Sequence, residues 1–524
     1  MEIVDNIVVK FQCPSETALL IRKSIPKSEI ISDTADIADV VVFYGLREMQ
    51  QLAHIAPLAI KVPSPIDRDY NWPGMYKPFD HQRDTARFLT LFQRAFCFNE
   101  AGTGKTSAAI WAADYLMHQG LVKRVLVVCP LSIMQCSWQA DLFNTAMHRT
   151  CAIAYGATSK REKIVTGDYD FVVINYDGVN VVEKAIRDAR FDLIIIDEAN
   201  SYKNASTKRW RTLARIVHKD AYIWMMTGTP AAQSPVDAFG LAKMINPTKV
   251  PKYMTAWKDM VMTQITRFKW IPKPNARDLV FEALQPAIRY EKSQCLDLPD
   301  VIYQTRIVAL SPQATKYYRD LVREMQIQAA GETISTVNAG AALSRLLQLS
   351  GGAVYTDDGN VVEFDISPRL VVLQEVLDEA LHKVIIFVPY RHTLTLLKNY
   401  LTKVGITNET ISGDVTANNR SLIFNNFQTM SDPRVLLIQP QAASHGVTLT
   451  AADTVVFWSP VMSVETYIQC IARIDRVGQK NHMTVIHLQG SEVERRMYTM
   501  LQNKVDLHEK LIDLYREELG ESNE

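Results

Sequence analysis

Three short segments of this sequence carry side chains that could bind and hydrolyse a nucleoside triphosphate. The first, NEAGTGKT at 99–106, is rich in glycine, follows an apolar stretch and precedes a helical pattern. Glycines let backbone N–H groups close around phosphate oxygens, and the N-terminus of a helix adds to the attraction. We expect Lys105 to reach the β and γ phosphates and Thr106 to bind Mg²⁺. The residues expected to bind the triphosphate are Gly102, Thr103, Gly104, Lys105 and Thr106.

This loop departs from the strict phosphate-binding pattern at its first position, where Asn99 replaces the expected glycine. By itself, the segment could be a glycine-rich turn with a solvated lysine. The choice between the two interpretations depends on whether the chain supplies the other parts of a hydrolytic site.

The second segment, DLIIIDE at 192–198, is an apolar run that ends in two carboxylates. Such a run is typical of a buried strand in a parallel sheet, and catalytic groups usually lie at the carboxyl ends of these strands. We expect Asp197 to hold Mg²⁺, directly or through water, and Glu198 to orient and deprotonate the attacking water. The alternative is two solvated acids at the start of a helix, where the helix dipole favours negative charge.

The third segment, QCIARIDRVGQ at 469–479, places Arg473 and Arg476 three residues apart. This spacing predicts that the two side chains share one face of a helix. Planar guanidinium groups can bridge the charge that spreads over a transferring phosphoryl group. Taken alone, the same pair could equally belong to a solvated helix face.

With these three segments in this order, the sequence resembles the superfamily-two helicases and translocases and, within them, the Swi/Snf-type branch of DNA-dependent ATPases. The resemblance covers roughly residues 76–500. YKPFDHQ at 76–82 resembles the adenine-recognition motif, which implies that Gln82 reads the base, and the segment 125–141 resembles the next motif, including its tryptophan, Trp138. The family implies two RecA-like lobes, with ATP and Mg²⁺ as cofactors.

The resemblance extends to segments that couple ATP hydrolysis to DNA movement in this family. MMTGTPAAQSPVD at 225–237 resembles the coupling turn, AIRYEKSQCLDLPD at 287–300 resembles the linker of the branch, and RVGQ is its typical ending. The sequence departs from the family pattern at DEANSYKN after the magnesium aspartate, at Ala472 before the first arginine and at AASHG in the coupling loop. We expect these departures to bear on the efficiency of nucleic-acid coupling more than on ATP binding. The residues implied for coupling or DNA contact are Thr227, Thr229, Gly446 and Gln469.

The pattern of apolar runs independently predicts an α/β fold with two parallel-sheet lobes. Runs at 125–130, 171–175, 192–197 and 223–228 alternate with helical stretches, and the same rhythm returns at 384–389, 435–439, 454–459 and 484–489. Buried strands separated by helices favour doubly wound parallel sheets. The domains expected are a small N-terminal α/β module at 1–66, lobe 1 at 67–247, a mostly helical insertion at 248–365, lobe 2 at 366–503 and a C-terminal helix at 504–524.

Two parts of the chain outside the lobes have less specific signals. The module at 1–66 ends at the proline-rich connection VPSPIDRDYNWPG and could recognise a DNA substrate or simply cap the first lobe. Within the insertion, TDDGN at 356–360 predicts the turn of a small hairpin, because Asp-Gly suits a tight reversal.

Composition limits the classes of partner. Lys plus Arg equals Asp plus Glu at 57 each, so no global basic field indicates nucleic acid, and local contacts are expected instead at 202–211 and 266–273, where basic and aromatic residues interleave. Each of these stretches could also be an ordinary solvated face. Seven scattered cysteines without paired spacing predict neither a disulfide framework nor a zinc site. The absence of an apolar run long enough for a membrane span predicts a soluble protein without membrane contact. The absence of a low-complexity tail and of a clustered basic localisation signal favours a bacterial or viral-host cytoplasm over a nucleus.

These observations lead to one preferred function and two alternatives. The preferred one is an ATP-dependent translocase that moves on duplex, forked or branched DNA, with RNA a less favoured partner. The alternatives are a strand-separating DNA or RNA helicase and, from another class, a DNA-binding scaffold that has lost ATP-driven movement.

Overall fold

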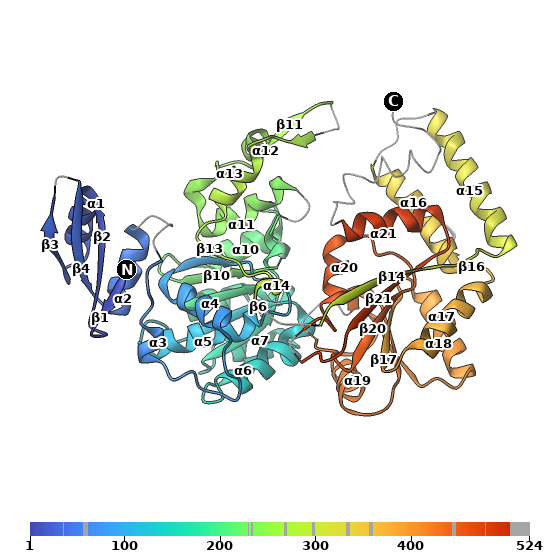
Figure 1. The fold of residues 1–524 in the computed structure, drawn as a ribbon, viewed down its shortest axis with the longest axis horizontal. Coiled ribbons are helices and arrows are strands. Elements are labelled where there is room, and N and C mark those ends of the chain that lie inside the picture. The colour runs from blue at the N-terminus through green and yellow to red at the C-terminus, as the bar shows by residue number, and fades with distance from the viewer. Residues whose placement is uncertain are drawn as a thin grey trace. The chain divides into compact units, whose positions relative to one another are not determined.

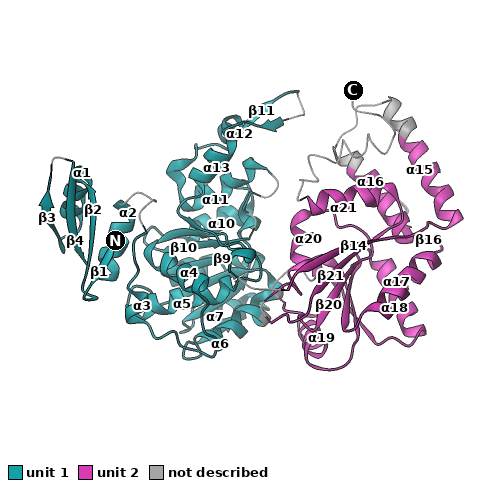
Figure 2. Ribbon diagram, in the orientation of Figure 1, with its two compact units in different colours: residues 1–295 teal, residues 296–524 magenta. Residues whose placement is uncertain are grey.

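The computed structural model of the chain divides into two units, residues 1–295 and 296–524 (Figure 2). In the part of the chain that the structure describes, no helix is long and apolar enough to cross a membrane. The described residues are 1–34, 36–55, 61–228, 230–231, 234–266, 270–295, 299–331, 336–355, 360–442, 447–476 and 478–503.

The first unit begins with the expected small α/β module, a four-stranded antiparallel sheet in the order β1-β2-β4-β3 with two helices (Figure 1). The module is fastened to the chain that follows it. The Tyr44 hydroxyl donates to the main-chain oxygen of Ser64 (2.8 Å), and Gln50 Nε2 donates to that of Thr90 (2.7 Å). These bonds are consistent with the cap alternative. The elements are β1 (Glu2–Val4), β2 (Val8–Pro14), α1 (Ser15–Ser24), β3 (Ser28–Asp33), β4 (Ile37–Phe43) and α2 (Leu46–Ile55).

The main sheet of the first unit has seven strands in the order β13-β5-β10-β9-β6-β8-β7, all paired in parallel. Along β9, Ile194 and Ile196 pack into the apolar cluster on one face, whereas Leu193 and Ile195 pack into the cluster on the other. Burial on both faces explains the continuous apolar runs, and the four strands predicted from them are confirmed. The strands are β13 (Ala287–Ile288), β5 (Arg94–Cys97), β10 (Tyr222–Met226), β9 (Leu193–Asp197), β6 (Val125–Cys129), β8 (Phe171–Asn175) and β7 (Cys151–Ile153).

Helices flank this sheet, and a short antiparallel hairpin extends from the unit (Figure 1). The helices are α3 (Ile66–Asp69), α4 (Asp80–Leu91), α5 (Lys105–His118), α6 (Ala140–Thr145), α7 (Thr158–Val165), α8 (Tyr176–Val181), α9 (Glu183–Ala189), α10 (Lys208–Ile216), α11 (Ala238–Ile245), α12 (Met254–Val261), α13 (Ala276–Ala283) and α14 (Lys292–Cys295). The hairpin is formed by β11 (Met262–Gln264) and β12 (Trp270–Pro272).

The segment predicted as one helical insertion, 248–365, contributes to both units. Its first part packs on the first unit, where Trp257 of α12 is buried in the same apolar cluster as strand β9. Its second part begins with β14, which pairs with β21 of the second unit. The division of the chain therefore falls after Cys295, inside this segment.

The second unit contains a parallel six-stranded sheet in the order β14-β21-β20-β17-β19-β18. The four apolar runs predicted in this half of the chain form β17, β19, β20 and β21, so the α/β fold with two parallel-sheet lobes is confirmed. The strands are β14 (Val301–Ile307), β17 (Lys383–Phe387), β18 (Asn408–Ile411), β19 (Val435–Ile438), β20 (Ala452–Phe457) and β21 (Met483–Gln489).

Helices surround the second sheet, and a small hairpin follows the second helix. Strands β15 (Ala353–Tyr355) and β16 (Val361–Glu363) pair antiparallel, as expected around TDDGN, although residues 356–359 of the turn lie outside the described part. The predicted C-terminal helix 504–524 also lies outside it. The helices are α15 (Pro312–Gly331), α16 (Thr336–Gly351), α17 (Ser367–Glu379), α18 (Arg391–Lys403), α19 (Ala417–Thr429), α20 (Val464–Ile471) and α21 (Glu492–Gln502).

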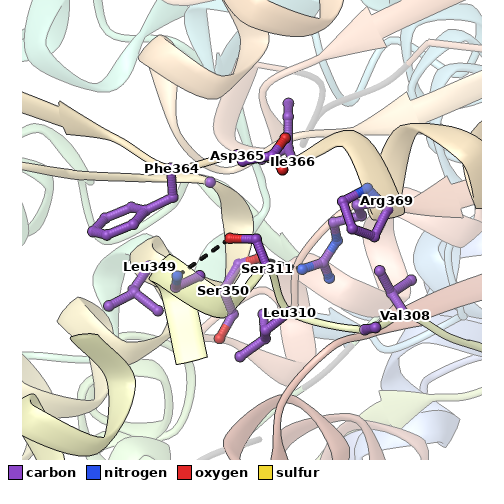
Figure 3. Close-up of a pocket in the computed structure, with 13 residues that line it drawn as sticks. Val308, Leu310, Ser311, Leu349, Ser350, Phe364, Asp365, Ile366 and Arg369 are labelled. Atoms are coloured by element: carbon purple, nitrogen blue, oxygen red, sulfur yellow. Dashed lines mark hydrogen bonds between the residues drawn. The ribbon is translucent and has the colours of Figure 1, made fainter. Parts of the chain in front are cut away.

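A buried ion pair links several elements of the second unit. Arg369 of α17 lies 2.7 Å from Glu494 of α21 through its Nη2 atom, and both side chains are buried. The guanidinium also donates to the main-chain oxygens of Ser350 in α16 and Leu488 in β21. A cavity of about 10 Å³ lies beside Arg369 (Figure 3), and its volume is close to the minimum that one water molecule needs. Its lining includes Ser311, Leu349 and Phe364.

Candidate nucleotide-binding site

The predicted phosphate-binding loop lies between strand β5 and helix α5 of the first unit. Gly102 and Gly104 have φ angles of 88° and 78°, a region that residues with a Cβ atom rarely adopt. A Cβ atom on Gly104 would also lie 2.0 Å from Nε2 of Gln82. Helix α5 begins at Lys105, directly after the second glycine. The loop thus has the strand, glycine turn and helix N-terminus that suit a phosphate.

Helix α4 holds this loop from the side of the predicted adenine motif. Gln82 Nε2 donates to the main-chain oxygen of Thr103 (3.2 Å), and His81 Nε2 lies 2.8 Å from the same oxygen. Gln82 Oε1 accepts from the main-chain N–H of Phe79 (3.0 Å). The structure therefore places Gln82 against the loop, and both of its amide atoms have partners. Its role in reading the base stays a prediction.

Asn99, the departure from the strict pattern, has a defined structural position. Its side chain is buried, and its Nδ2 atom donates to Thr85 Oγ1 (2.8 Å) while its Oδ1 atom accepts from the main-chain N–H of Tyr290 (3.0 Å). Its main-chain oxygen accepts from Lys105 Nζ (2.8 Å). A glycine at this position could make only the last of these three contacts. The sequence interpretation missed Thr85 and Tyr290 as supports of the loop, and the polar Asn99 was the signal that could have indicated them.

Asp197 lies at the carboxyl end of β9 and is buried, so it is not a solvated acid, whereas Glu198 is half-buried. Trp138 Nε1 donates to its Oδ2 atom (2.9 Å), and the main-chain N–H of Glu198 donates to its Oδ1 atom (3.0 Å). Burial raises the pKa of Asp197, whereas the charge of Lys105 and these two donors act in the opposite direction. The tryptophan of the predicted second motif thus contacts the predicted magnesium ligand.

Glu198 follows with a left-handed backbone, φ 49° and ψ 55°, which is uncommon for a residue other than glycine. The Tyr176 hydroxyl lies beside this turn and donates to the main-chain oxygens of Asp197 (2.7 Å) and Glu198 (3.2 Å). A conformation of this kind persists only where surrounding contacts support it, and it commonly occurs at functional sites. Tyr176 is therefore a support of the acidic pair that the sequence interpretation did not assign.

The residues around the loop fit a magnesium nucleotide. Magnesium in such sites is typically bound by one or two protein oxygens, substrate phosphates and water. The buried Asp197 carboxylate and the Thr106 hydroxyl, on the first turn of α5, are of this type. Among the described residues, no group of three His, Cys, Asp or Glu side chains could hold a metal ion without the nucleotide.

The prediction that Arg473 and Arg476 share a helix face is wrong. Helix α20 ends at Ile471, and both arginines lie in the turns that follow. The main-chain oxygen of Arg473 accepts from the N–H of Leu449 (2.9 Å), so it is engaged by another segment instead of a following helical turn. The two side chains nevertheless converge, because Nη1 of Arg473 (3.3 Å) and of Arg476 (3.0 Å) both donate to the main-chain oxygen of Val447.

Comparisons with known proteins agree with this geometry. The family model for the SNF2-related domain matches residues 81–350, which is more than half of the chain, and that for the helicase conserved C-terminal domain matches residues 369–478. The chain belongs to the SNF2-related family. The first match contains the loop, the acidic pair and the linker, and the second contains both arginines.

Individual relatives of this SNF2-family chain are distant. Mouse chromodomain-helicase-DNA-binding protein 1-like is 25% identical over 439 residues, which cover 79% of this chain and 47% of the relative. Putative protein p41 of Acyrthosiphon pisum secondary endosymbiont phage 1 is 24% identical, covering 78% of this chain and 91% of the relative. The Sulfolobus solfataricus SWI2/SNF2 ATPase core in complex with dsDNA is 21% identical with a TM-score of 0.42, covering 84% of this chain and 94% of that chain. The chain spans less than half the length of the first three curated relatives that it matches.

The predicted coupling turn of this SNF2-family chain contacts the predicted phosphate loop. The main-chain N–H of Thr227 donates to the main-chain oxygen of Cys97 at the end of β5 (3.0 Å), and a Cβ atom on Gly228 would lie 3.3 Å from the main-chain nitrogen of Ala101. Thr227 and, in the second unit, Gln469 are buried. Thr229 and Gly446, the other residues predicted for coupling, lie outside the described residues.

The two basic and aromatic stretches proposed to contact nucleic acid make contacts within the chain. In 202–211, Arg209 pairs with Asp177 (2.8 Å), and in 266–273, Lys273 Nζ donates to the main-chain oxygen of Asp259 (2.6 Å). Residues 267–269 lie outside the described part. Both stretches remain predictions as DNA contacts.

Proposed function

We propose that this SNF2-family protein is an ATP-dependent translocase that moves on duplex, forked or branched DNA. The observation that carries the proposal is the arrangement at the carboxyl edge of the first sheet. A glycine loop, Lys105 and a buried Asp197 held by Trp138 lie together there, next to the coupling turn at Thr227. ATP and Mg²⁺ are the cofactors that this arrangement fits.

Five side chains at this edge have assigned roles in the proposal. Lys105 and the loop N–H groups bind the β and γ phosphates, and Gln82 reads the base. Thr106 and Asp197 hold Mg²⁺, which neutralises charge on the phosphates when it is bound. Glu198 orients and deprotonates the attacking water.

The second unit contributes the two arginines. We assign to Arg473 and Arg476 the stabilisation of charge on the transferring phosphoryl group, a role that suits planar guanidinium groups. Their shared acceptor, the Val447 oxygen, shows that the two side chains can approach one point. Thr227, Thr229, Gly446 and Gln469 are proposed to couple the nucleotide state to the grip on DNA.

The DNA partner and the setting are proposals supported by the relatives. The Sulfolobus core is described with dsDNA, and the mouse relative is named as a DNA-binding protein. The phage protein p41, covered over 91% of its length, is consistent with the cytoplasm of a bacterial host. Remodelling of forks or branches is the finer part of the proposal.

The first test is steady-state ATP hydrolysis by the purified chain without nucleic acid and with single-stranded DNA, linear duplex, forked duplex or structured RNA. Lys105→Ala should reduce hydrolysis to background, and Glu198→Gln should lower kcat by roughly 10²- to 10⁴-fold, the usual contribution of a general base. Lys184→Ala is the matched control, because Lys184 is an exposed lysine paired with Asp188 on helix α9. It should leave hydrolysis unchanged.

The nucleic-acid arms distinguish the alternatives. Stimulation by duplex or forked DNA supports the translocase. Stimulation only by single strands or RNA would instead favour a strand-separating helicase, and hydrolysis indifferent to every nucleic acid would favour a scaffold without a motor. Normal hydrolysis in both Lys105→Ala and Glu198→Gln would contradict the assigned site.

A further inference from the structure

The segment that leads out of the first unit runs directly along the phosphate loop. Strand β13 pairs with β5, and the pairing continues beyond the end of both strands. The main-chain oxygens of Pro286, Ile288 and Tyr290 accept in turn from the N–H groups of Phe96 (2.9 Å), Phe98 (2.8 Å) and Glu100 (3.0 Å). The last of these donors belongs to the loop itself. Five residues after Tyr290, the chain passes from the first unit into the second.

Asn99 contacts both this segment and Lys105, the lysine proposed to bind phosphate. Its side-chain oxygen accepts from the main-chain N–H of Tyr290, and its side-chain nitrogen donates to Thr85 of helix α4. Its main-chain oxygen accepts from Lys105 Nζ. The side chain is 1% exposed, so both of its amide atoms depend on these partners. A displacement of Asn99 therefore changes contacts with the lysine, the adenine-side helix and the outgoing segment together.

Two further bonds tie the outgoing segment to the same region. The Tyr290 hydroxyl donates to Asp84 Oδ2 on helix α4 (2.6 Å), and the main-chain N–H of Lys292 donates to Glu100 Oε2 in the loop (3.1 Å). Residues 290–292 thus accept one hydrogen bond from the loop backbone, donate two to loop side chains and donate one to helix α4. No part of this arrangement lies in the second unit.

We propose that Asn99 and Tyr290 are positioning residues that transmit nucleotide binding at the loop to the segment entering the second unit. The inference rests on the proposed ATP site. When ATP binds, Lys105 Nζ turns from the main-chain oxygen of Asn99 to a phosphate, and the loop closes on the ligand. The closed loop restricts the motion of Asn99, so the hydrogen bond from the Tyr290 N–H to Asn99 Oδ1 opens less often. Because coupling between two sites is reciprocal, a constrained outgoing segment also favours nucleotide binding.

Hydrogen exchange of the full chain, with and without a non-hydrolysable ATP analogue and Mg²⁺, tests this transmission. The amides of Tyr290 and Lys292 should exchange at least about fivefold more slowly with the analogue, the lower end of usual coupling strengths. In Asn99→Ala, the Tyr290 amide should exchange faster and lose its response to the analogue. Tyr290→Phe keeps the main-chain bonds and loses only the bond to Asp84, so its response should be reduced. Binding of a fluorescent ATP analogue is measured in parallel for every variant.

Tyr222→Phe is the matched control, because it removes a tyrosine hydroxyl of the same unit whose partner is Gln50, away from the loop. It should respond like the unchanged protein. An unchanged protein that binds the analogue without any change at 290–292 would overturn the inference and leave the proposed function standing. The same protection in Asn99→Ala as in the unchanged protein would also overturn it. A chain that binds no ATP would overturn both.

Kinetics give a second measurement. In Tyr290→Phe, the ratio of duplex-stimulated to basal kcat should fall at least about fivefold, while the KM for ATP changes less than the ratio. A purely structural role would lower basal and stimulated rates alike, and that result would contradict the inference. Asn99→Gly, which creates the strict loop pattern, should reproduce the loss, because glycine cannot hold Tyr290 or Thr85.

Discussion

The buried ion pair of the second unit and the proposed nucleotide site of the first unit hold their charged side chains in different ways. In the second unit, Arg369 and Glu494 neutralise each other, and Glu494 Oε2 also accepts from the main-chain N–H of Gly490 (2.7 Å). In the first unit, Asp197 accepts from two neutral N–H groups, and Lys105 donates to a main-chain oxygen. The hydrogen bonds of Arg369 and Glu494 are thus made to groups within the protein. The proposed nucleotide site has a carboxylate whose pKa is raised by burial and a lysine that donates to a neutral acceptor, so neither charge is neutralised by a dedicated partner of opposite charge.

The largest expected change in stability is that of Arg369→Met, which removes one side of the buried ion pair. Removing one member of a buried pair leaves Glu494 uncompensated, and the free energy of unfolding of the second unit should fall by about 3–5 kcal/mol. Urea denaturation measures the loss. Arg391→Ala is the control, because Arg391 and Asp414 form an exposed pair (3.1 Å) whose loss should cost less than about 1 kcal/mol. Equal losses would mean that the buried pair is not a structural support.

A second prediction uses the buried His487 of β21, which lies 2.9 Å from the Tyr467 hydroxyl. Burial lowers the pKa of His487 to about 4, whereas an unfolded histidine titrates near 6.5. Between these values the unfolded chain binds more protons, so lowering the pH from about 6.5 towards 4 should remove up to about 3 kcal/mol of stability.

Thermal unfolding across this pH range measures the effect of His487. His487→Gln should flatten the dependence in the second unit, whereas His118→Gln, at an exposed position on α5, should not. A slope that persists in His487→Gln would assign the pH dependence to other groups.

A smaller effect is expected for Trp138→Phe in the first unit. The change removes the indole N–H from the Asp197 carboxylate, which disfavours the ionised form, so the pKa of Asp197 should rise further. The acidic limb of the kcat/KM profile should move to higher pH, because a charge-assisted hydrogen bond to the carboxylate is lost. Trp224→Phe removes an indole bond to the Phe92 oxygen in the same sheet and should leave the limb in place. A shift shared by both variants would reflect loss of packing.

The smallest effect should come from Ser491→Ala beside the buried ion pair. Ser491 caps helix α21 through the N–H of Glu494 (3.4 Å) and accepts from Ser350 (2.8 Å). Loss of a helix cap costs about 1 kcal/mol. The free energy of unfolding of the second unit should fall by that amount, and the affinity of the first unit for ATP should not change. A change in ATP affinity would show that the two buried centres are linked.

The parts that could be predicted from sequence are those with local causes. Strands buried on both faces reveal themselves as apolar runs, and the loop glycines are required by positive φ angles at Gly102 and Gly104. The supports of the site could not be predicted in this way. Tyr290 meets Asn99 across 191 residues, and Arg473 lies beyond the end of helix α20, where its carbonyl oxygen accepts from Leu449. Such contacts depend on how distant segments pack and have no local pattern.

The position of strand β13 has a consequence for synthesis of the chain. It is the edge strand of the sheet, next to β5. In the sequence, however, it comes after β10 and after helices α11, α12 and α13. A nascent chain that has emerged only as far as α11 therefore exposes β5 as an unpaired edge, with the phosphate loop lacking the bonds from residues 286–292. Unpaired edges invite association with other strands. A fragment made to isolate the nucleotide-binding half must accordingly extend beyond Lys292, and one that stops at α11 should aggregate.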